Sequence, residues 1–544
     1  MRVTVVCTFC LFAAIGGLFA QQQTAMVPDE IFFNGKIITV DSAFKIQEAF
    51  AVRGDTFLAI GSNAAIRALA GPQTKLTDLR GHAVIPGLMD NHIHPWRAVF
   101  GNLKGIDLTG VHSVQEIGDR IRQGAATKPG RNIYATGLWS EADLDDKRGP
   151  TRAELDQIMP DRPLMVLQAR QKAYLNGAAL KATGIGRNTK AVYGEPLPKD
   201  ANGEPTGVLT NAWAIMTVGA QLIPIEDIRE LSLQTQQDLN AQGFTSIREP
   251  MVPNPIMRMY SNLRREGKLT LRIAMGLDVG AQQADELDDI LSPLGVGPSF
   301  GDHWLRLDSV GEYAIDGNTS TNPTPEMFRR GVMTMHRYGW RPAPHTTSDK
   351  ALDIVLDTYD AADRVKPIGK ERWVVEHIPM VRTDQLDRLA KLGIVVSAQF
   401  QPYRGSENMI KTYGRERAER AVPMREMLDH HLIVNAGSDW GGGPVTNPFI
   451  PIYFYVTRKT ENGTVLDTAQ KISREQALRV STINTAYLTF EEDVKGSIEP
   501  GKLADFLILS QDILTVPDEQ IRSIQPLATY VGGRKMFSRK DGGF

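Results

Sequence analysis

The sequence predicts an α/β fold, in which a (β/α)8 barrel is joined to a composite β-sandwich formed by both termini. Three observations predict it. The chain has 544 residues, which is more than one ordinary domain, so at least two structural units are expected. Both ends consist of short strand-like segments. Between them, apolar strand-like segments alternate with helical stretches, an alternation that indicates a parallel sheet.

Residues 1–20 form the first predicted element, a signal peptide. Arg2 precedes an apolar run that ends at Ala20, and the polar stretch "QQQTA" follows. A retained membrane anchor is the alternative, but no basic flank stops the transfer, so we expect a secreted or periplasmic protein without stable membrane insertion. Cys7 and Cys10 are the only cysteines and lie in this segment. The mature chain therefore lacks thiols, which excludes disulfides and thiolate metal sites.

The charge balance indicates the kind of partner. The 61 basic and 63 acidic residues nearly cancel, and no basic block is present. The electrostatic field that would attract nucleic acid or an anionic membrane is therefore missing. We expect a small-molecule partner, and a homo-oligomer stays open.

The predicted β-sandwich combines residues 26–85 with residues 489–544. The N-terminal part reads "IFFNGKIITV" and "EAFAVRGDTFLAIG", with turns at Asn34-Gly35 and Gly54-Asp55. The C-terminal part reads "GKLADFLIL" and "LATYVGGRKMF". Neither part can bury a face alone, so we expect the two to pair.

The predicted barrel spans residues 86–488, with an insertion at about residues 100–240 that holds the strand-like "NIYATGLW" and "PLMVLQAR". A doubly wound open sheet is the alternative, but no glycine-rich phosphate loop supports it. Eight is the number of strands that closes a barrel. The eight expected strands are 83–92, 244–248, 271–277, 305–313, 341–345, 373–377, 394–400 and 432–439.

Metal-ligand side chains close four of these strands. His92 and His94 end the first, His345 the fifth, His377 the sixth and Asp439 the eighth. In a barrel the carboxyl ends of the strands share one face, and residues two apart on a strand point the same way. Imidazoles and a carboxylate suit zinc and similar divalent ions. A lone His-x-His is weak evidence, and a strand-end histidine is more often an ordinary hydrogen-bonded residue, but the coincidence of four among ten histidines favours a metal site.

Several motifs together resemble the amidohydrolase superfamily, in particular its family-3 amidohydrolase branch. They are "VIPGLMDNHIHP", "RPAPHTTSDKALDIVLD", "WVVEHI", "VNAGSDWGGGPVTNPF" and "GSIEPGKLADFLIL", and the resemblance covers residues 28–538. It implies a metal-dependent barrel with a composite β-sandwich. By motif position, His92, His94, His345 and His377 would be metal ligands, and Asp439 would be a ligand and proton carrier. Asp349 in "HTTSD" would orient the neighbourhood.

The chain departs from the family pattern at two places. Many relatives carry a lysine whose carboxylated side chain bridges two metals, whereas "SVGEYAIDG" places Glu312 there as the candidate ligand. The glutamate carboxyl is three bonds nearer the backbone, roughly 3 to 4 Å at ordinary bond lengths, so either the backbone moves inward or the second metal is weak or absent. Glu249 in "SIREP" is a second candidate carboxylate. Relatives often have a histidine in the segment that precedes "NS.AL", whereas this chain reads "QARQKAYLNGAAL" and has Arg170 and Lys172 there. We interpret these two cations as solvated rather than as contacts for an anionic substrate.

The predicted function is metal-dependent hydrolysis of amide-type, non-peptide carbon–nitrogen bonds in a small molecule. One or two divalent ions, zinc above all, would activate water, with Asp439 as general base and then acid. The metal or a histidine, with His377 as the candidate, would stabilise the oxyanion. The loops 141–150 and 401–414 are expected to wall the pocket. Alternatives are a mononuclear deaminase, a metal-dependent esterase or lactonase, and a secreted binding protein on a degenerate barrel.

Overall fold

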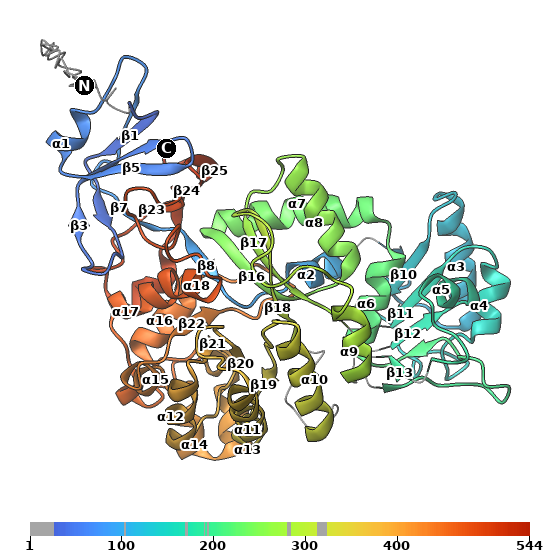
Figure 1. The fold of residues 1–544 in the computed structure, drawn as a ribbon. Helices are drawn as coiled ribbons and strands as arrows, with labels where there is room; N and C mark the ends of the chain where they lie inside the picture. The colour runs from blue at the N-terminus through green and yellow to red at the C-terminus, as the bar shows by residue number, and fades with distance from the viewer. Residues whose placement is uncertain are drawn as a thin grey trace, which may run out of the picture.

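The fold is seen in a computed structural model that describes residues 27–102, 105–168, 172–189, 191–192, 195–279, 284–312 and 324–544. The predicted signal peptide and Arg170 lie outside these residues. Within them, every helix is too short or too polar to cross a membrane. Figure 1 shows the terminal strands on one side, a central α/β unit, and a third group of elements on the far side.

Strands from the two ends of the chain share one sheet. In a six-stranded sheet of order β25-β24-β23-β7-β2-β3, β7 pairs antiparallel with β23, so that Ile85 lies opposite Leu507. A four-stranded sheet of order β5-β4-β1-β6 lies beside it. The strands are β1 (Glu30–Phe33), β2 (Lys36–Ile38), β3 (Ile46–Gln47), β4 (Ala49–Arg53), β5 (Thr56–Gly61), β6 (Lys75–Asp78), β7 (Ala83–Pro86), β23 (Phe506–Leu509), β24 (Pro526–Val531) and β25 (Arg534–Ser538).

An aromatic cluster joins the two terminal sheets. Phe32 stacks on Phe50 at 4.8 Å between ring centroids, and both rings meet Phe506 edge-on. All three side chains are buried, and Phe506 in turn stacks on Tyr530. Aromatic rings bury large apolar areas, so this cluster holds the N-terminal and C-terminal strands together.

Each of the eight predicted segments overlaps a strand of the central unit, although the first segment is split and Ala83–Pro86 belongs to β7 of the terminal sheet. The strands of the central unit form two four-stranded parallel sheets, of order β18-β17-β16-β8 and β19-β20-β21-β22. Their bounds are β8 (Leu88–Asp90), β16 (Phe244–Val252), β17 (Arg272–Leu277), β18 (Leu305–Val310), β19 (His345–Thr346), β20 (Val374–His377), β21 (Val395–Gln399) and β22 (Val434–Gly437). β19 is shorter than the expected 341–345 because Pro342 and Pro344 have no N–H group to donate to the ladder.

Backbone contacts link the outer strands of these two sheets. On one side a parallel bridge joins Val310, at the end of β18, to Pro342. On the other side the Asp439 amide donates to the His92 carbonyl, and the His94 amide donates to the Trp440 carbonyl, both at 2.8 Å. The sheets are thus linked at both edges, without forming one continuous ladder.

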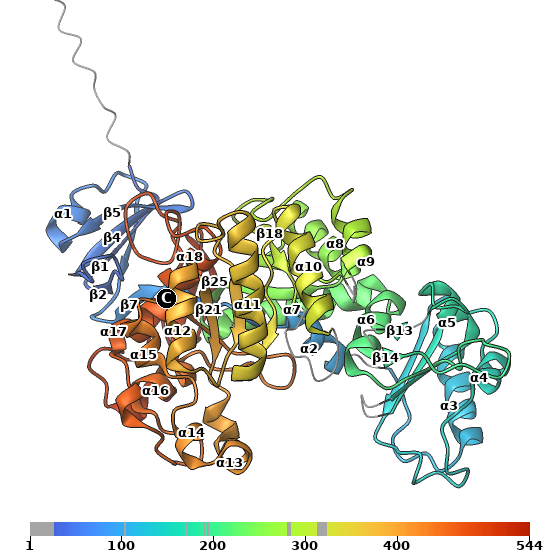
Figure 2. The same cartoon turned by 60° about the horizontal axis from the view of Figure 1, so that its bottom comes forward.

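Amphipathic helices follow the strands and cover them. In α11, Leu352, Val355 and Tyr359 are buried at helical spacing, and Tyr359 packs edge-on against Trp373 beside β20. Figure 2 shows α10, α11 and α12 side by side over the central strands. The helices of this unit are α2 (Pro95–Asn102), α7 (Ile225–Gln242), α8 (Asn254–Arg265), α9 (Ala284–Leu291), α10 (Pro325–Arg337), α11 (Asp349–Val365), α12 (Thr383–Leu392), α13 (Pro402–Tyr413), α14 (Arg415–Glu419), α15 (Met424–Asp429), α16 (Phe449–Thr457), α17 (Arg474–Val480) and α18 (Ile483–Leu488).

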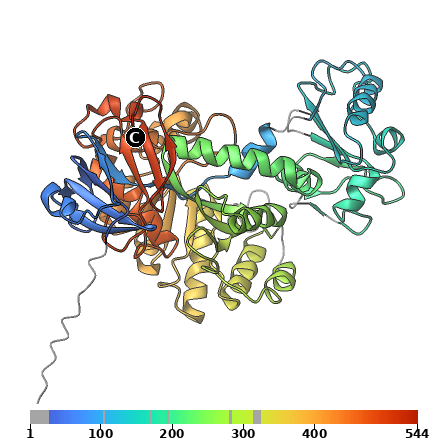
Figure 3. The same ribbon diagram turned by 90° about the horizontal axis from the view of Figure 1, so that it is seen from above.

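The residues predicted as an insertion contain a separate five-stranded sheet of order β15-β12-β11-β10-β9. "NIYATGLW" and "PLMVLQAR" supply β10 and β11 of this sheet, with its own apolar clusters beneath. Figure 3 shows this group projecting from the central unit. Its elements are β9 (Ile106–Asp107), α3 (Val114–Ala126), β10 (Ile133–Gly137), α4 (Arg152–Ile158), β11 (Leu164–Gln168), β12 (Lys172–Leu175), α5 (Gly177–Ala182), β13 (Ala191–Val192), β14 (Glu195–Pro196), β15 (Val208–Leu209) and α6 (Ala212–Leu222).

Candidate metal centre

The structure brings the predicted ligand residues together, most of them at the carboxyl ends of their strands. His92 and His94 follow β8, Glu312 follows β18, His345 begins β19, His377 ends β20, and Asp439 follows β22. The His92 ring centroid lies 4.7 Å from that of His377, which lies 4.3 Å from that of His345. His92, His94 and Glu312 are almost completely buried, whereas the Asp439 side chain is 34% exposed. Asp439 therefore connects the cluster to solvent.

Three ligand atoms form a compact triangle. The His92 and His94 Nε2 atoms are 3.2 Å apart, and Asp439 Oδ1 lies 3.6 Å from the first and 3.4 Å from the second. Ligands about 2.0 to 2.1 Å from a tetrahedral zinc ion lie about 3.3 to 3.4 Å from one another. The side chains are thus already spaced as the ligands of one such ion.

Glu312 lies between the two histidine pairs. Its Oε2 atom is 2.7 Å from His92 Nε2, and its Oε1 atom is 3.4 Å from His345 Nδ1 and 3.9 Å from His377 Nε2. The shorter side chain therefore does reach the cluster. A carboxylate that turns one oxygen to each pair can bind one ion or bridge two.

The backbone leaves the extended conformation where two of these side chains project. His377 has φ 70° and Asp439 has φ 53°, in the left-handed region that is uncommon for residues other than glycine. Such conformations cost free energy and concentrate at functional sites. A glycine is also needed nearby, since a Cβ atom on Gly437 would lie 2.7 Å from the His92 Cβ. β22 approaches His92 this closely only because residue 437 has no side chain.

The electrostatics of the cluster favour a bound cation. Burial works against the charged form of His92, but the Glu312 and Glu376 carboxylates raise its pKa well above the ordinary value. Burial likewise works to raise the pKa of Asp439, yet hydrogen bonds from His92 and His94 lower it well below the ordinary value. Burial, with Arg97 nearby, lowers the pKa of His94 to about 3. His94 is therefore neutral at pH 7, and a neutral imidazole is the form that binds metal.

Polar atoms without hydrogen-bond partners provide a further test of whether the residues fit a metal. His377 Nε2 is buried and has no hydrogen-bond partner among the described residues. A buried polar atom without a partner costs free energy, which a coordinated ion would recover. Together with the donor types and the triangle above, this shows that the residues fit a divalent ion.

Sequence reasoning missed the residues that hold the histidines. His92 Nδ1 lies 2.7 Å from Glu376 Oε2, and Arg248 Nη1 lies 2.7 Å from the other Glu376 oxygen. His377 Nδ1 lies 2.6 Å from Gln399 Oε1. Each of these partners lies within a buried strand, where the sequence does not show which residue it contacts. The available signal was that a fully buried charge needs a partner.

Three of the residues considered from the sequence have other roles. Glu249 accepts hydrogen bonds from the Trp96 amide at 3.2 Å and the Tyr260 hydroxyl at 3.0 Å, and burial raises its pKa to about 8. Asp349 lies in the first turn of α11 and pairs with Arg417 at 3.1 Å. Lys172 pairs with Glu141 at 2.5 Å. None of the three belongs to the metal-binding groups of the described residues.

The other histidines also lie outside those groups. His82 contacts the Leu509 carbonyl at 3.0 Å, His336 packs edge-on against Trp373, and His430 pairs with Asp387 at 3.0 Å.

A cavity of about 240 Å³ opens beside Asp439. It is lined by Phe400, Gln401, Arg404, Ser438, Asp439, Trp440, Gly441, Gly442 and Thr446. Segment 401–414 thus contributes to the wall as expected, but it is mostly helix α13 rather than a loop. The lining includes no residue of the loop 141–150.

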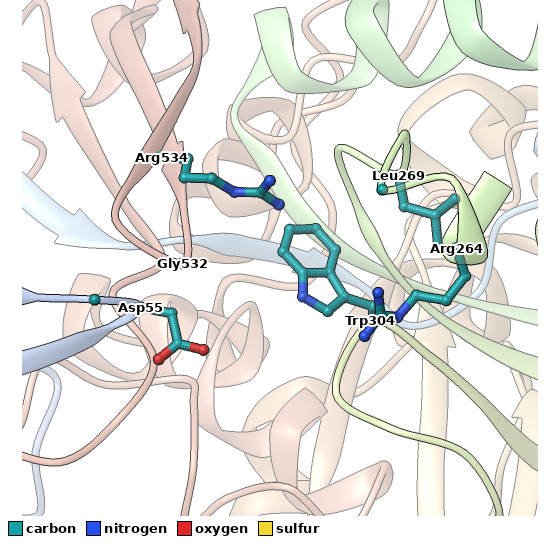
Figure 4. Close-up of a pocket in the computed structure, with 8 residues that line it drawn as sticks. Asp55, Arg264, Leu269, Trp304, Gly532 and Arg534 are labelled. Atoms are coloured by element: carbon teal, nitrogen blue, oxygen red, sulfur yellow. The ribbon is translucent and has the colours of Figure 1, made fainter.

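A second, larger cleft of about 320 Å³ lies near the terminal strands. Figure 4 shows Trp304, Arg264 and Arg534 around it, with the Arg534 guanidinium 4.7 Å from the Trp304 ring centroid. No member of the metal-ligand cluster lines this cleft.

Comparisons with known proteins place the cluster in a wider context. The model of the amidohydrolase family matches residues 75–537. The N-substituted formamide deformylase of Arthrobacter pascens is 27% identical over 94% of this chain and 98% of its own length. An uncharacterised metal-dependent hydrolase of Pyrococcus horikoshii has a similar fold, with TM-score 0.66, 22% identity, and coverage of 90% of this chain and 99% of its own. Atrazine chlorohydrolase of Arthrobacter aurescens, complexed with zinc, aligns with TM-score 0.52 and 12% identity over 94% of this chain and 95% of its own.

Proposed function

Because the chain belongs to the amidohydrolase family, we propose that it hydrolyses an amide-type, non-peptide carbon–nitrogen bond in a small molecule, with the help of a divalent metal ion. The observation that carries the proposal is the triangle of His92, His94 and Asp439, whose ligand atoms lie 3.2 to 3.6 Å apart. The formamide deformylase relative supports the bond type.

The same geometry favours zinc as the ion. Nitrogen and oxygen ligands at tetrahedral spacing, with one side open to a cavity, are typical of catalytic zinc sites. His92, His94 and Asp439 would hold the first ion. Glu312, His345 and His377 offer a second position, although the separations of 3.4 and 3.9 Å from Glu312 Oε1 are less uniform.

When bound, a divalent ion supplies Lewis acidity, which makes water nucleophilic near neutral pH and polarises a carbonyl group. The other steps belong to side chains. Asp439, ionised and facing the cavity, accepts the proton of the attacking water and then donates it to the leaving amine. His377 donates from Nδ1 to Gln399 Oε1, so its Nε2 lone pair faces the cluster, where it would help to hold the ion that polarises the carbonyl group. Trp440 and Phe400 would exclude water from the reacting bond.

We also infer that the two central sheets act as one closed (β/α)8 barrel and that the terminal sheets form a composite β-sandwich. The contacts at both sheet edges support the barrel, and the pairing of β7 with β23 supports the sandwich. A barrel explains why ligands from five strands meet, since the carboxyl ends of its strands surround one point.

The place of action follows from the sequence as a further proposal. We propose that the chain is exported through residues 1–20 and meets its small-molecule substrate outside the cytoplasm. Sequencing the N-terminus of the exported protein tests this, and a first residue at or near Gln21 is expected.

The decisive experiment combines metal analysis with a substrate panel of formamides, other N-acyl amines, esters and aminated heterocycles. We expect about one or two equivalents of zinc per chain and turnover of amide-type substrates only. Ammonia release from a heterocycle would identify a deaminase instead, and turnover confined to esters would identify an esterase. Metal-free protein with all ligands intact would indicate a binding protein.

A further inference from the structure

A chain of buried charges begins at His92 Nδ1, the ring nitrogen that lies outside the ligand triangle. His92 Nδ1 is 2.7 Å from Glu376 Oε2, and Glu376 Oε1 is 2.7 Å from Arg248 Nη1. Arg248 Nε is 2.5 Å from Asp308 Oδ2, and Asp308 also pairs with Arg341. All of these side chains are at most 2% exposed. Two anions alternate with two cations, so the network is electrically balanced without water.

The direction of the first hydrogen bond is fixed by chemistry. A carboxylate has no proton to donate, so the bond between Glu376 and His92 has Nδ1–H as its donor. Arg248 pairs with Glu376 and thereby keeps it a carboxylate. Because Nδ1 keeps its proton for Glu376, Nε2, the atom that belongs to the ligand triangle, is the nitrogen available to bind a metal.

We propose that Glu376 is a positioning residue that fixes the tautomer and ring orientation of His92 for metal binding, and that Arg248 holds Glu376 in place. This inference rests on the proposed metal-dependent function. Glu376 touches neither the cavity nor a candidate reacting atom, so it acts only through His92.

The network also connects the two central sheets. Glu376 belongs to β20 of one sheet, whereas Arg248 and Asp308 belong to β16 and β18 of the other. Arg248 Nη1 further donates to the Asn91 carbonyl at 3.2 Å, next to His92 itself. The orientation of one metal ligand is thereby fixed by residues from three strands.

The test separates positioning from simple stabilisation by comparing two variants of the same Arg248 network. Glu376→Gln removes the charge that faces His92, whereas Asp308→Asn removes the charge on the opposite side of Arg248. For each purified full-length variant, the melting temperature of the metal-free protein and the zinc dissociation constant by chelator competition are measured. The absorption spectrum of the Co²⁺ form reports ligand geometry independently of activity.

We expect both variants to melt at lower temperature than wild type, because each leaves part of a buried charge network unpaired. Only Glu376→Gln should weaken zinc binding, by about 10- to 100-fold, and change the Co²⁺ spectrum. If Glu376→Gln does not fold, Glu376→Asp takes its place: the pair with Arg248 keeps its charge, and the contact with Nδ1 lengthens by roughly one bond, about 1.5 Å.

Equal zinc affinity in wild type and the Glu376 variant would overturn this inference alone. So would an equal loss of affinity in Asp308→Asn, since the effect would then be general packing. Wild-type protein that binds no zinc would overturn the proposed function, and this inference with it.

Discussion

His94 Nε2 and Asp439 Oδ1 lie 3.4 Å apart, although one residue follows the first central strand and the other follows the last. The contact is made because the backbone of the two segments is paired there, with the His94 amide donating to the Trp440 carbonyl at 2.8 Å. Strand pairing therefore determines the distance between two candidate metal ligands.

Asp439→Asn should fold normally and lose most of its turnover. The amide keeps an oxygen at the ligand position but accepts no proton, and general acid–base catalysis contributes about 10²- to 10⁴-fold in rate. We expect kcat to decrease by a factor in that range, while the circular dichroism spectrum stays unchanged. Wild-type turnover in this variant would show that another group carries the proton.

Zinc should raise the melting temperature of the metal-free wild-type protein and restore its activity. An ion that binds only the folded state stabilises it by about 2.7 kcal/mol when its concentration is 100 times the dissociation constant. His94→Ala removes one corner of the ligand triangle, so its melting temperature should respond far less to zinc. An equal response in both proteins would place the ion elsewhere.

Gly437→Ala should weaken zinc binding, since the added Cβ would lie 2.4 Å from Asn91 Oδ1 and 2.7 Å from His92 Cβ. Either His92 or β22 has to move, and a core under such steric pressure typically loses about 1 to 3 kcal/mol. Gly405→Ala is the matched control: nothing lies within 4 Å of its added Cβ. Because residue 405 lies in helix α13, this change should stabilise the folded protein slightly, by about 0.5 to 1 kcal/mol. The measurements are zinc affinity and denaturant unfolding of both variants.

Glu249 should make the protein less stable as the pH rises. Burial raises its pKa from 4.5 to about 8. The folded state therefore binds the proton of the Glu249 carboxyl more tightly than the unfolded state does. The stability that this protonated carboxyl contributes is fully present below pH 4.5 and is lost as the pH rises toward 8. Each pKa unit is worth about 1.4 kcal/mol, so the loss amounts to a few kcal/mol.

The corresponding variant is Glu249→Gln, which does not titrate. Its unfolding free energy, measured by denaturant titration between pH 5 and 8, should fall less steeply with pH than that of wild type. Identical slopes would mean that Glu249 is ionised in the folded protein.

Much of the central fold could be predicted because its strands are short apolar runs with polar residues at their ends. Each of the eight segments overlaps an observed strand, and the ligand residues lie at or just beyond the ends of these segments. The length of β19 could not be predicted from hydrophobicity alone, although Pro342 and Pro344 carried the signal. The sequence predicts a loop over 401–414, where the structure has helix α13, because the first turn of this helix holds Pro402 and Gly405, which are more typical of irregular segments.

The positioning residues could not be predicted, for a different reason. Glu376 in "VVEH" and Arg248 in "SIREP" are charged residues inside apolar strands, and the sequence around each of them does not indicate which residue it pairs with. The pairing arises only when β16 and β20 are brought together by the fold. Whether the Glu312 carboxylate reaches the histidines could not be predicted for the same reason, because the answer depends on where the histidines from neighbouring strands lie.

The pairing of Ile85 with Leu507 also has a consequence for the order in which the newly made chain can fold. Strand β7 emerges from the ribosome early, but its neighbour β23 is translated only after the whole central unit. Until then one edge of β7 presents open hydrogen-bonding groups, the kind of surface that promotes aggregation. The sheet around β7 can therefore be completed only when synthesis is nearly finished. A C-terminal truncation that removes β23 would leave this edge of β7 unpaired permanently.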